Sequence, residues 1–358
     1  MTYISKHQAA NADGFNHSIG ILRAIMAFEV VLCHFWVVPD INAVPWFLLP
    51  LKQLELKAVP VYMVISFYYL IIKLNHIPAK DVLKQRTHRL LIPYIGWALI
   101  YFFIFGIIEN LCSGMFAGSV TLGSLCMQVL LGSCEELCPQ FWYMCILIML
   151  STLSIYSFHK FSYKTNLIIL LALSLFSYFL QYSGINYALF GKLPYSSKYT
   201  LGRIAEMIPL ASAGVLLAVI NTKCCESIKM HPYIWVIGAI TVVILSFRFD
   251  GCLPVKYGFA YAGINNLFLS ASITMTAILL PLSYLPGIIK RIIKFFSKYS
   301  FGVYCIHWAI GKYMMEFLQQ NGIPDRRFMQ CVIVLCISYA LSWLISLLPF
   351  HSVKYLVE

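Results

Sequence analysis

Residues 18–38 read SIGILRAIMAFEVVLCHFWVV, an unbroken apolar stretch that also holds an arginine, a glutamate and a histidine. As an α-helix it would rise about 31 Å, enough to cross the roughly 30 Å hydrocarbon layer of a bilayer. Charged residues interrupt it and no small-residue cleavage site follows it, which argues against a cleaved signal peptide. The stretch therefore predicts a retained transmembrane helix.

Nine further stretches have a similar length and apolar character, and none alternates as a barrel strand would. A shorter stretch over 119–132 predicts an interfacial or re-entrant helix. The chain is thus predicted to be all-α, a polytopic integral membrane bundle of about ten transmembrane helices. We expect one domain over 1–358, with no appended soluble domain. The nine stretches are 57–74, 90–109, 140–158, 165–183, 201–220, 231–248, 264–285, 299–318 and 328–349.

The composition agrees with a membrane protein. Of the 358 residues 60% are hydrophobic and 11% charged, and the mean hydropathy is +0.79. Soluble domains carry about 25% charged residues, so this chain has too few to cover a water-facing surface. A soluble globular enzyme, a disordered chain and a coiled coil are excluded. The net charge of +12 falls in short loops and not on one patch, which argues against nucleic acid and favours topology signals and contacts to an anionic ligand.

The distribution of lysine and arginine predicts the orientation of the chain. With the N-terminus inside, 15 of these residues fall in inner segments and 10 in outer ones, and the outer connection 110–138 has none. Cytoplasmic loops carry the excess of positive charge. We therefore expect both termini in the cytoplasm and a multi-pass protein of the cell membrane.

The twelve cysteines do not form an obvious disulfide framework or zinc motif, and we expect no metal site. Most lie in apolar runs, where cysteine is a small buried hydrophobe. Cys134 and Cys138 lie in the long outer connection. They are either bridged or free thiols, and the sequence leaves both readings open.

Ionisable residues inside a membrane span are functional candidates because burying a charge there is costly. Arg23 and His34 are eleven residues apart, so both lie on one helix face, about 16 Å apart along the axis. Glu29 points elsewhere. The pair is either part of a site or a structural arginine and a core histidine.

Two other segments carry candidate site residues. Arg86 and Arg89, at the inner mouth of the third expected span, are three residues apart and would share a helix face, where two guanidiniums can clamp phosphates. A simple anchor to lipid headgroups is the alternative. In the ninth expected span, His307 lies near mid-membrane, either as a packing histidine or as part of a site.

Taken in chain order, these features resemble the membrane acyltransferase-3 family of O-acyltransferases. Each motif alone is weak, and the ordered set from about 18 to 310 is specific. The sequence departs from the pattern at Phe67, where a glycine is usual, and at Gln140, where a histidine is frequent. The matching residues are Arg23 and His34; residues 62–67; Arg86, Arg89, Leu90 and Pro93; Trp142 and Tyr143; and Ser300, Gly302, Tyr304 and His307.

The resemblance implies an enzyme of the bacterial inner membrane that moves an acyl group, usually acetyl, from cytoplasmic acyl-CoA. The acceptor would be a sugar hydroxyl on a surface polysaccharide or lipid-linked glycan. No permanently bound cofactor is expected, because acetyl-CoA is a donor substrate.

On this interpretation each site residue has a role. His34 is the general base or, alternatively, the site of a covalent acyl-histidine, and Arg23 binds the donor or stabilises charge. Arg86 and Arg89 hold the CoA phosphates. The candidates for positioning are Ser300, Tyr304 and His307.

Two other functions remain compatible with the bundle and its basic loops. One is a transporter or flippase for a lipid-linked sugar, and the other a non-catalytic subunit of a glycan-assembly complex. Neither predicts the ordered motif set. The sequence leaves the acceptor, the acyl group and the oligomeric state open.

Overall fold

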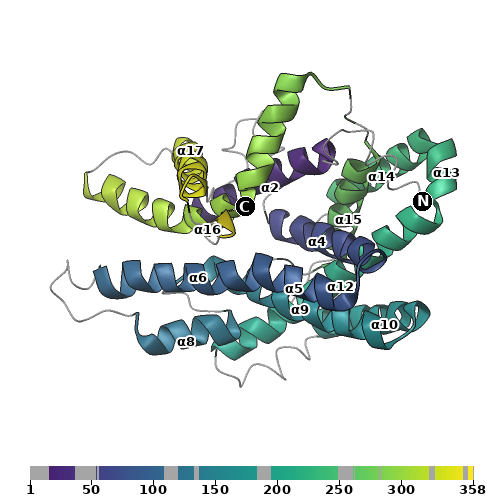
Figure 1. Cartoon of the computed structure of the whole chain (residues 1–358), viewed down its shortest axis with the longest axis horizontal. Coiled ribbons are helices and arrows are strands. Elements are labelled where there is room, and N and C mark those ends of the chain that lie inside the picture. Colours follow the sequence, from purple (N-terminus) through teal and green to yellow (C-terminus); the bar gives the residue numbers. More distant parts are fainter. Residues whose placement is uncertain are drawn as a thin grey trace. The chain divides into compact units, whose positions relative to one another are not determined.

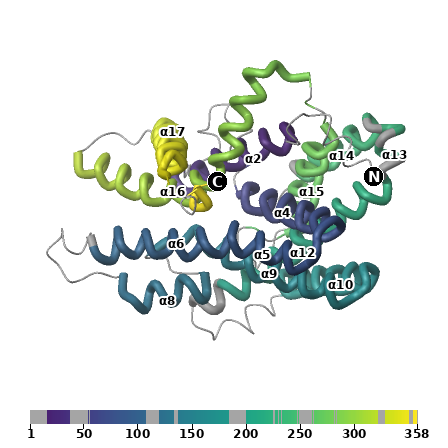
Figure 2. The backbone as a smooth tube through the Cα atoms, viewed as in Figure 1, coloured from purple at the N-terminus to yellow at the C-terminus, as the bar shows by residue number. Residues whose placement is uncertain are grey.

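The computed structural model describes most of the chain, and within the described residues every secondary-structure element is helical. Figure 1 shows these helices, and Figure 2 follows the same backbone from purple at the N-terminus to yellow at the C-terminus. The described residues are 16–36, 54, 56–108, 120–132, 137–183, 195–248, 261, 263–280, 282, 284–321, 327–349 and 354–357.

Each of the ten expected spans corresponds to a helix. Six helical segments are long and apolar enough to cross a bilayer, and they begin at His17, Ala79, Pro139, Tyr163, Thr200 and Phe328. The count of ten spans and the positions of the termini stay predictions. The ten helices are α2 (His17–Phe35), α4 (Ala58–Leu74), α6 (Ile92–Tyr101) with η4 (Phe102–Ile108), α9 (Trp142–Lys160), α10 (Tyr163–Ser183), α12 (Tyr195–Lys223), α14 (Pro232–Arg248), α15 (Ile264–Leu279), α16 (Gly287–Gln320) and α17 (Arg327–Ser346).

Shorter helices fill several connections. The expected interfacial helix at 119–132 is present as α8, which a capping box at Thr121 begins and the left-handed Gly132 ends. The ninth span differs most from expectation, because α16 begins at Gly287 and not near residue 299. The short helices are α5 (Ala79–Arg86), η3 (Thr87–Leu91), α8 (Leu122–Leu131), η5 (Pro139–Phe141) and α13 (Cys225–Met230).

The helices fall into two compact units. Unit 1 comprises Met1–Ile65, Leu216–Leu253 and Ile264–Glu358, and unit 2 comprises Ser66–Val215 and Pro254–Gly263. Helices α4 and α12 each contribute to both. The expectation of one domain over the whole chain stays a prediction.

In unit 1, α2 packs against α15, α16 and α17, and its apolar face forms the centre of a buried cluster. The closest approach is at Gly311 of α16, where an added Cβ would lie 1.9 Å from Cζ of Phe35. Only glycine lets the two helices pack this closely. The buried members of the cluster are Ala27, Val31, Leu32, Phe35, Trp36, Tyr299, Val303, Cys331, Val334 and Tyr339.

A buried carboxylate fixes α4 against α2. The Oε2 atom of Glu29 accepts a hydrogen bond of 3.1 Å from the backbone N–H of Ala58, the first residue of α4. A helix N-terminus has unsatisfied N–H groups and a partial positive charge, so a carboxylate there stabilises it. Next to it, the Lys57 ammonium donates to Oδ1 of Asn266 on α15 at 2.5 Å. Glu29 thus holds the helix start, and its role in the structure is architectural.

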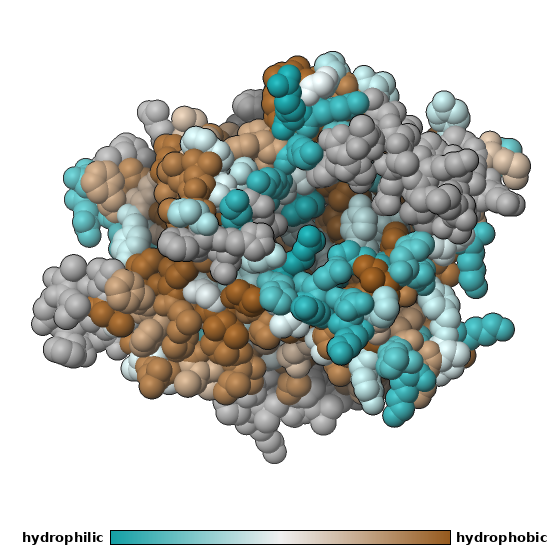
Figure 3. Space-filling view, in the orientation of Figure 1, coloured by the Kyte–Doolittle hydropathy of each residue, from teal (hydrophilic) through white to brown (hydrophobic). Residues whose placement is uncertain are grey.

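In unit 2, α5, α8 and α10 pack around α9, whose first two turns are almost entirely buried. The Tyr94 hydroxyl of α6 donates to the carbonyl oxygen of Gln128, which joins α6 to α8. Figure 3 shows apolar side chains gathered over α6 and α8 and hydrophilic ones over α5. Because the exposed residues of α6 are apolar, this face is suited to lipid.

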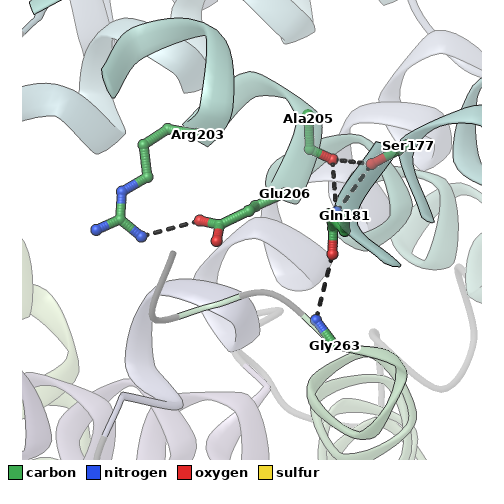
Figure 4. Close-up of polar contacts among 6 residues, drawn as sticks. All are labelled: Ser177, Gln181, Arg203, Ala205, Glu206 and Gly263. Atoms are coloured by element: carbon green, nitrogen blue, oxygen red, sulfur yellow. Dashed lines mark hydrogen bonds and ion pairs between the residues drawn. The ribbon is translucent and has the colours of Figure 1, made fainter. Parts of the chain in front are cut away.

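An ion pair lies buried in α12 of unit 2 (Figure 4). Arg203 and Glu206 are paired at 2.9 Å, and the guanidinium carbon lies 4.6 Å from the ring centre of Trp142 and 4.8 Å from that of Tyr261. Both charged side chains are almost fully buried. The pair and the two rings neutralise a charge that would otherwise be costly inside the bundle.

Polar contacts at Ala205, in the same turn of α12 as the ion pair, tie three segments together (Figure 4). Ser177 of α10 donates to the carbonyl oxygen of Ala205, and the Gln181 amide donates to the same oxygen at 3.3 Å. The Gln181 side-chain oxygen accepts a 3.3 Å bond from the N–H of Gly263. One side chain on α10 therefore holds both α12 and the turn before α15.

We expect Gly311→Ala to lower stability by about 1–3 kcal/mol, because the new methyl group overlaps the Phe35 ring and must displace it. The matched control is Gly287→Ala, where an added Cβ meets nothing within 4 Å. Thermal unfolding in detergent measures both variants. Equal melting temperatures would contradict the close-packing argument.

We expect Glu206→Ala to cost about 3–5 kcal/mol, because it leaves the buried Arg203 charge without its carboxylate. The double variant Arg203→Met with Glu206→Met removes both charges and should be more stable than Glu206→Ala alone. Thermal unfolding of the single and double variants tests this. A double variant that is less stable than the single one would show that the ion pair is not the dominant interaction.

Candidate functional site

Two of the candidate residues meet in unit 1. The imidazole rings of His34 on α2 and His307 on α16 have their centres 5.3 Å apart, with 34° between the ring planes. His307 is fully buried and His34 is only partly buried. Of the two imidazoles, His34 is therefore the nearer to the surface. The sequence named both residues but gave no reason for them to be in contact.

The hydrogen bonding of His307 fixes its tautomer. Its Nδ1 lies 3.0 Å from the carbonyl oxygen of Val303, one turn earlier on the same helix. A carbonyl oxygen only accepts, so Nδ1 carries the proton, and in the neutral imidazole Nε2 then carries the lone pair. Among the described residues Nε2 has no hydrogen-bond partner. A buried acceptor without a partner is costly, which makes it a candidate for an interaction during function.

Aromatic side chains enclose the two histidines. The Trp308 ring lies 5.4 Å from that of His34, and the Phe35 ring lies 6.3 Å from both imidazoles. Tyr304, one turn before His307 on α16, lies 6.3 Å from it. These rings pack around the two imidazoles. The structure thus brings together three of the predicted site residues, His34, Tyr304 and His307.

Arg23 and Ser300 belong to a separate polar group. The Tyr62 hydroxyl of α4 donates to the backbone oxygen of Arg23 at 2.8 Å and also interacts with the Ser300 side chain. Arg23 also lies near the hydroxyls of Tyr62 and Tyr339. Arg23 lies three helical turns from His34, so the two do not reach the same atom of a substrate.

Arg86 of unit 2 is held by a single residue of α4. Its Nη1 donates to the Ser66 hydroxyl at 2.8 Å, and its Nη2 donates to the Ser66 carbonyl oxygen, also at 2.8 Å. The planar guanidinium is suited to such paired bonds. Each terminal nitrogen donates one bond to Ser66, so the other N–H groups of the guanidinium stay available to another acceptor.

The chain changes helix type between Arg86 and Arg89. Arg86 ends α5, and Arg89 lies within η3, a π-helical turn over Thr87–Leu91. Such turns are rare and frequently mark functional sites. The sequence analysis expected Arg86 and Arg89 to share a helix face because it assumed α-helical spacing. The wider π turn changes the angle between the two side chains. Arg86 is partly buried, whereas Arg89 is exposed.

Lys73 is a third cation that the sequence reasoning treated only as a topology signal. It lies in the last turn of α4, donates to Oε1 of Gln85 at 3.1 Å, and lies near the positive charges of both Arg86 and Arg89. The sequence could have indicated its place in this group, because Lys73 lies at the end of the preceding helix, a short connection away from the two arginines. In the described part of the chain none of these three cations is paired with a carboxylate. Their mutual repulsion would be relieved by a bound anion.

Tyr143 of α9 lies near Arg86. This links two segments that the sequence analysis singled out separately, the aromatic pair at the start of α9 and the arginines before α6. Gln140, the departure from the expected histidine, donates to the Tyr101 hydroxyl at 3.1 Å and is buried. Of the cysteines proposed for a bridge, Cys134 lies outside the described residues.

The histidine pair of unit 1 and the cation group of unit 2 have different chemical capacities. An accessible imidazole backed by a second one can accept and return a proton. The group of Lys73, Arg86 and Arg89, in which only some of the N–H groups already donate hydrogen bonds, can hold an anion such as phosphate.

The chain was compared with known proteins and families. A family model of acyltransferase 3, described as an acyltransferase domain, matches residues 16–347. No curated protein and no solved structure matches the chain. The match spans more than nine-tenths of the sequence and includes both the histidine pair and the cation group. With its apolar helices, the chain is therefore a multi-pass membrane protein that belongs to the acyltransferase-3 family.

Proposed function

We propose that the protein transfers an acetyl group from cytoplasmic acetyl-CoA to a sugar hydroxyl of a surface polysaccharide or lipid-linked glycan at the bacterial inner membrane. The observation that carries this proposal is the pairing of an accessible histidine, His34, with a buried one, His307, inside an acyltransferase-3 chain. Acyl transfer requires a base, because a hydroxyl becomes a good nucleophile only as its proton is removed, and His34 beside His307 can serve as that base.

In the proposed reaction His34 takes the proton of the acceptor hydroxyl as its oxygen attacks the thioester carbonyl. The carbon–sulfur bond then breaks, the acetyl ester forms, and the coenzyme A sulfur leaves with the proton that His34 returns. Protons and electrons balance without a further reactant. An acyl-histidine intermediate is the alternative course, and a burst of label on the protein would distinguish it.

His307 acts as the positioning residue for His34. Its Nε2 lone pair is available to accept a hydrogen bond from the His34 N–H, which would leave the other His34 nitrogen free to act as the base. Catalytic hydrogen bonds are often long before substrate binds, so the 5.3 Å ring separation is compatible with this role. Tyr304 packs against His307 and limits its rotation.

The cationic residues bind the donor. Arg86, Arg89 and Lys73 supply three positive charges for the phosphates of coenzyme A, and Ser66 holds Arg86 in place. Arg23 lies three turns from His34, too far to stabilise an oxyanion there, so we assign its guanidinium to the donor as well, while Tyr62 holds its backbone oxygen.

We expect His34→Ala to lower the rate of acetyl transfer by about 10²–10⁴-fold, because the variant lacks the base. Donor affinity should stay within about twofold. The assay incubates purified protein with radiolabelled acetyl-CoA and a glycan pool and measures labelled glycan. His159→Ala, which removes an exposed histidine from the last turn of α9, is the matched control and should keep full activity.

Wild-type turnover by the His34 variant would remove His34 from the mechanism. Movement of an unmodified lipid-linked sugar across vesicles, with no labelled glycan, would instead support the flippase.

We expect Arg89→Ala to raise the apparent acetyl-CoA constant about 10- to 100-fold, because a charge-assisted hydrogen bond contributes roughly 1.5–3 kcal/mol. Saturating donor should restore most of the rate, since Arg89 does not touch the reacting atoms. Arg89→Lys should recover only part of the affinity, because lysine keeps the charge and loses the planar fork. Isothermal titration of acetyl-CoA measures these affinities.

Lys80→Ala is the control for the donor site, because it removes an exposed cation of α5 that takes no part in the cation group. Unchanged affinity in Arg89→Ala, or an equal loss in Lys80→Ala, would contradict a specific phosphate contact.

A further inference from the structure

The opening turns of α16 carry a charge pattern that the proposed reaction does not use. Residues 287–298 contain four cations and no carboxylate, and the next acid along the helix is Glu316. At about 100° per residue, the four cations fall within an arc of about 100°, so they form one stripe along more than two turns. All except Lys290, which is partly buried, are exposed. The stripe consists of Lys290, Arg291, Lys294 and Lys298.

An exposed apolar stripe adjoins the cations. Ile288 is 58% exposed, Ile292 48% and Phe295 38%. On the third side of the same turns, Ile293 and Ser297 are buried against the protein. The helix surface therefore divides into a cationic, an apolar and a protein-facing stripe. This is the pattern of a helix that lies in a membrane interface, with its charges among headgroups and its apolar side chains in the acyl boundary.

The length of α16 places these turns outside the hydrocarbon. Thirty-four residues of helix have an axis of about 51 Å, whereas the hydrocarbon layer is about 30 Å thick. In Figure 1 the opening turns, the green ribbon at the top of the view, run in a different direction from the closing turns. Figure 3 shows hydrophilic and apolar side chains together on them. The charged turns therefore do not continue the span that carries His307.

We propose that residues 287–298 form a binding surface for anionic phospholipid headgroups at the boundary between lipid and water. The headgroup phosphates bind Arg291, Lys294 and Lys298, and the acyl chains cover Ile288 and Ile292. The charge bias predicts that this segment faces the cytoplasm, and anionic lipids are concentrated in that leaflet. The inference is independent of the transfer reaction, since it needs neither donor nor acceptor.

The form of the cation stripe favours lipid over a soluble phosphate ligand. The four charges extend about 12 Å along the helix and stay exposed, which suits a row of headgroups better than one small anion. The cation group near Arg86 differs, because its residues come from three elements, α4, α5 and η3, and one of them is held by two hydrogen bonds. An apolar stripe beside the charges has no purpose in a soluble-anion site.

The test titrates the full-length protein, in a neutral detergent, with short-chain phosphatidylglycerol and with phosphatidylcholine of the same chain length. Microscale thermophoresis gives both affinities. We expect the wild type to prefer phosphatidylglycerol. Arg291→Gln with Lys294→Gln should weaken that binding about 25-fold, at about fivefold for each cation, and leave phosphatidylcholine unchanged.

Two further variants keep the result interpretable. Lys160→Gln with Lys164→Gln removes two exposed lysines elsewhere in the chain and should retain the preference. Arg291→Lys with Lys294→Arg keeps both charges and should also retain it, which separates loss of charge from loss of fold.

Three outcomes would overturn the proposal: no preference in the wild type, an equal loss in the Lys160 and Lys164 variant, or an undiminished preference in the Arg291 and Lys294 variant. Displacement of phosphatidylglycerol by coenzyme A, lost in that variant, would also overturn it and assign the stripe to a soluble phosphate. Transfer activity is not measured, so the outcome stands apart from that of the proposed reaction.

Discussion

The close contact between α2 and α16 is the constraint on which the candidate site of unit 1 depends. Gly311 has no Cβ, so the Phe35 ring can lie directly against the α16 backbone. That approach brings His34 and His307 to a ring separation of 5.3 Å. A bulkier residue would separate the helices, and each histidine would then be an isolated polar group in an apolar bundle. The close packing of α2 on α16 is therefore also what places the two histidines together.

Unit 2 supports its cations differently. Lys73, Arg86 and Arg89 repel one another, so a structure that keeps them together must fix at least one of them. Ser66 does so with two oxygens, one from its side chain and one from its backbone. The π turn then places Arg89 on the surface while Arg86 stays partly buried. The repulsion is retained in the free protein, which suits a site whose anionic ligand supplies the missing charge.

Hydropathy alone located the helices, because crossing a bilayer demands a run of apolar residues whatever the tertiary packing. It did not locate the start of α16, since the amphipathic turns from Gly287 have too many charges to be read as a span. The ordered motifs identified His34, His307 and Arg86. The pairing of His34 with His307 could not be read from them, because it joins residues 273 positions apart through a glycine contact.

The contact at Gly311 also limits how the sequence can change in length. One residue inserted between Arg23 and His34, or between Gly302 and Gly311, would turn the rest of the helix by about 100° and shift it by about 1.5 Å. The imidazole would then leave its partner, and the ring of Phe35 would meet a side chain in place of the glycine. Loops between helices tolerate such insertions. Within these two segments the spacing itself is part of the site, so an insertion or deletion there is more damaging than most substitutions.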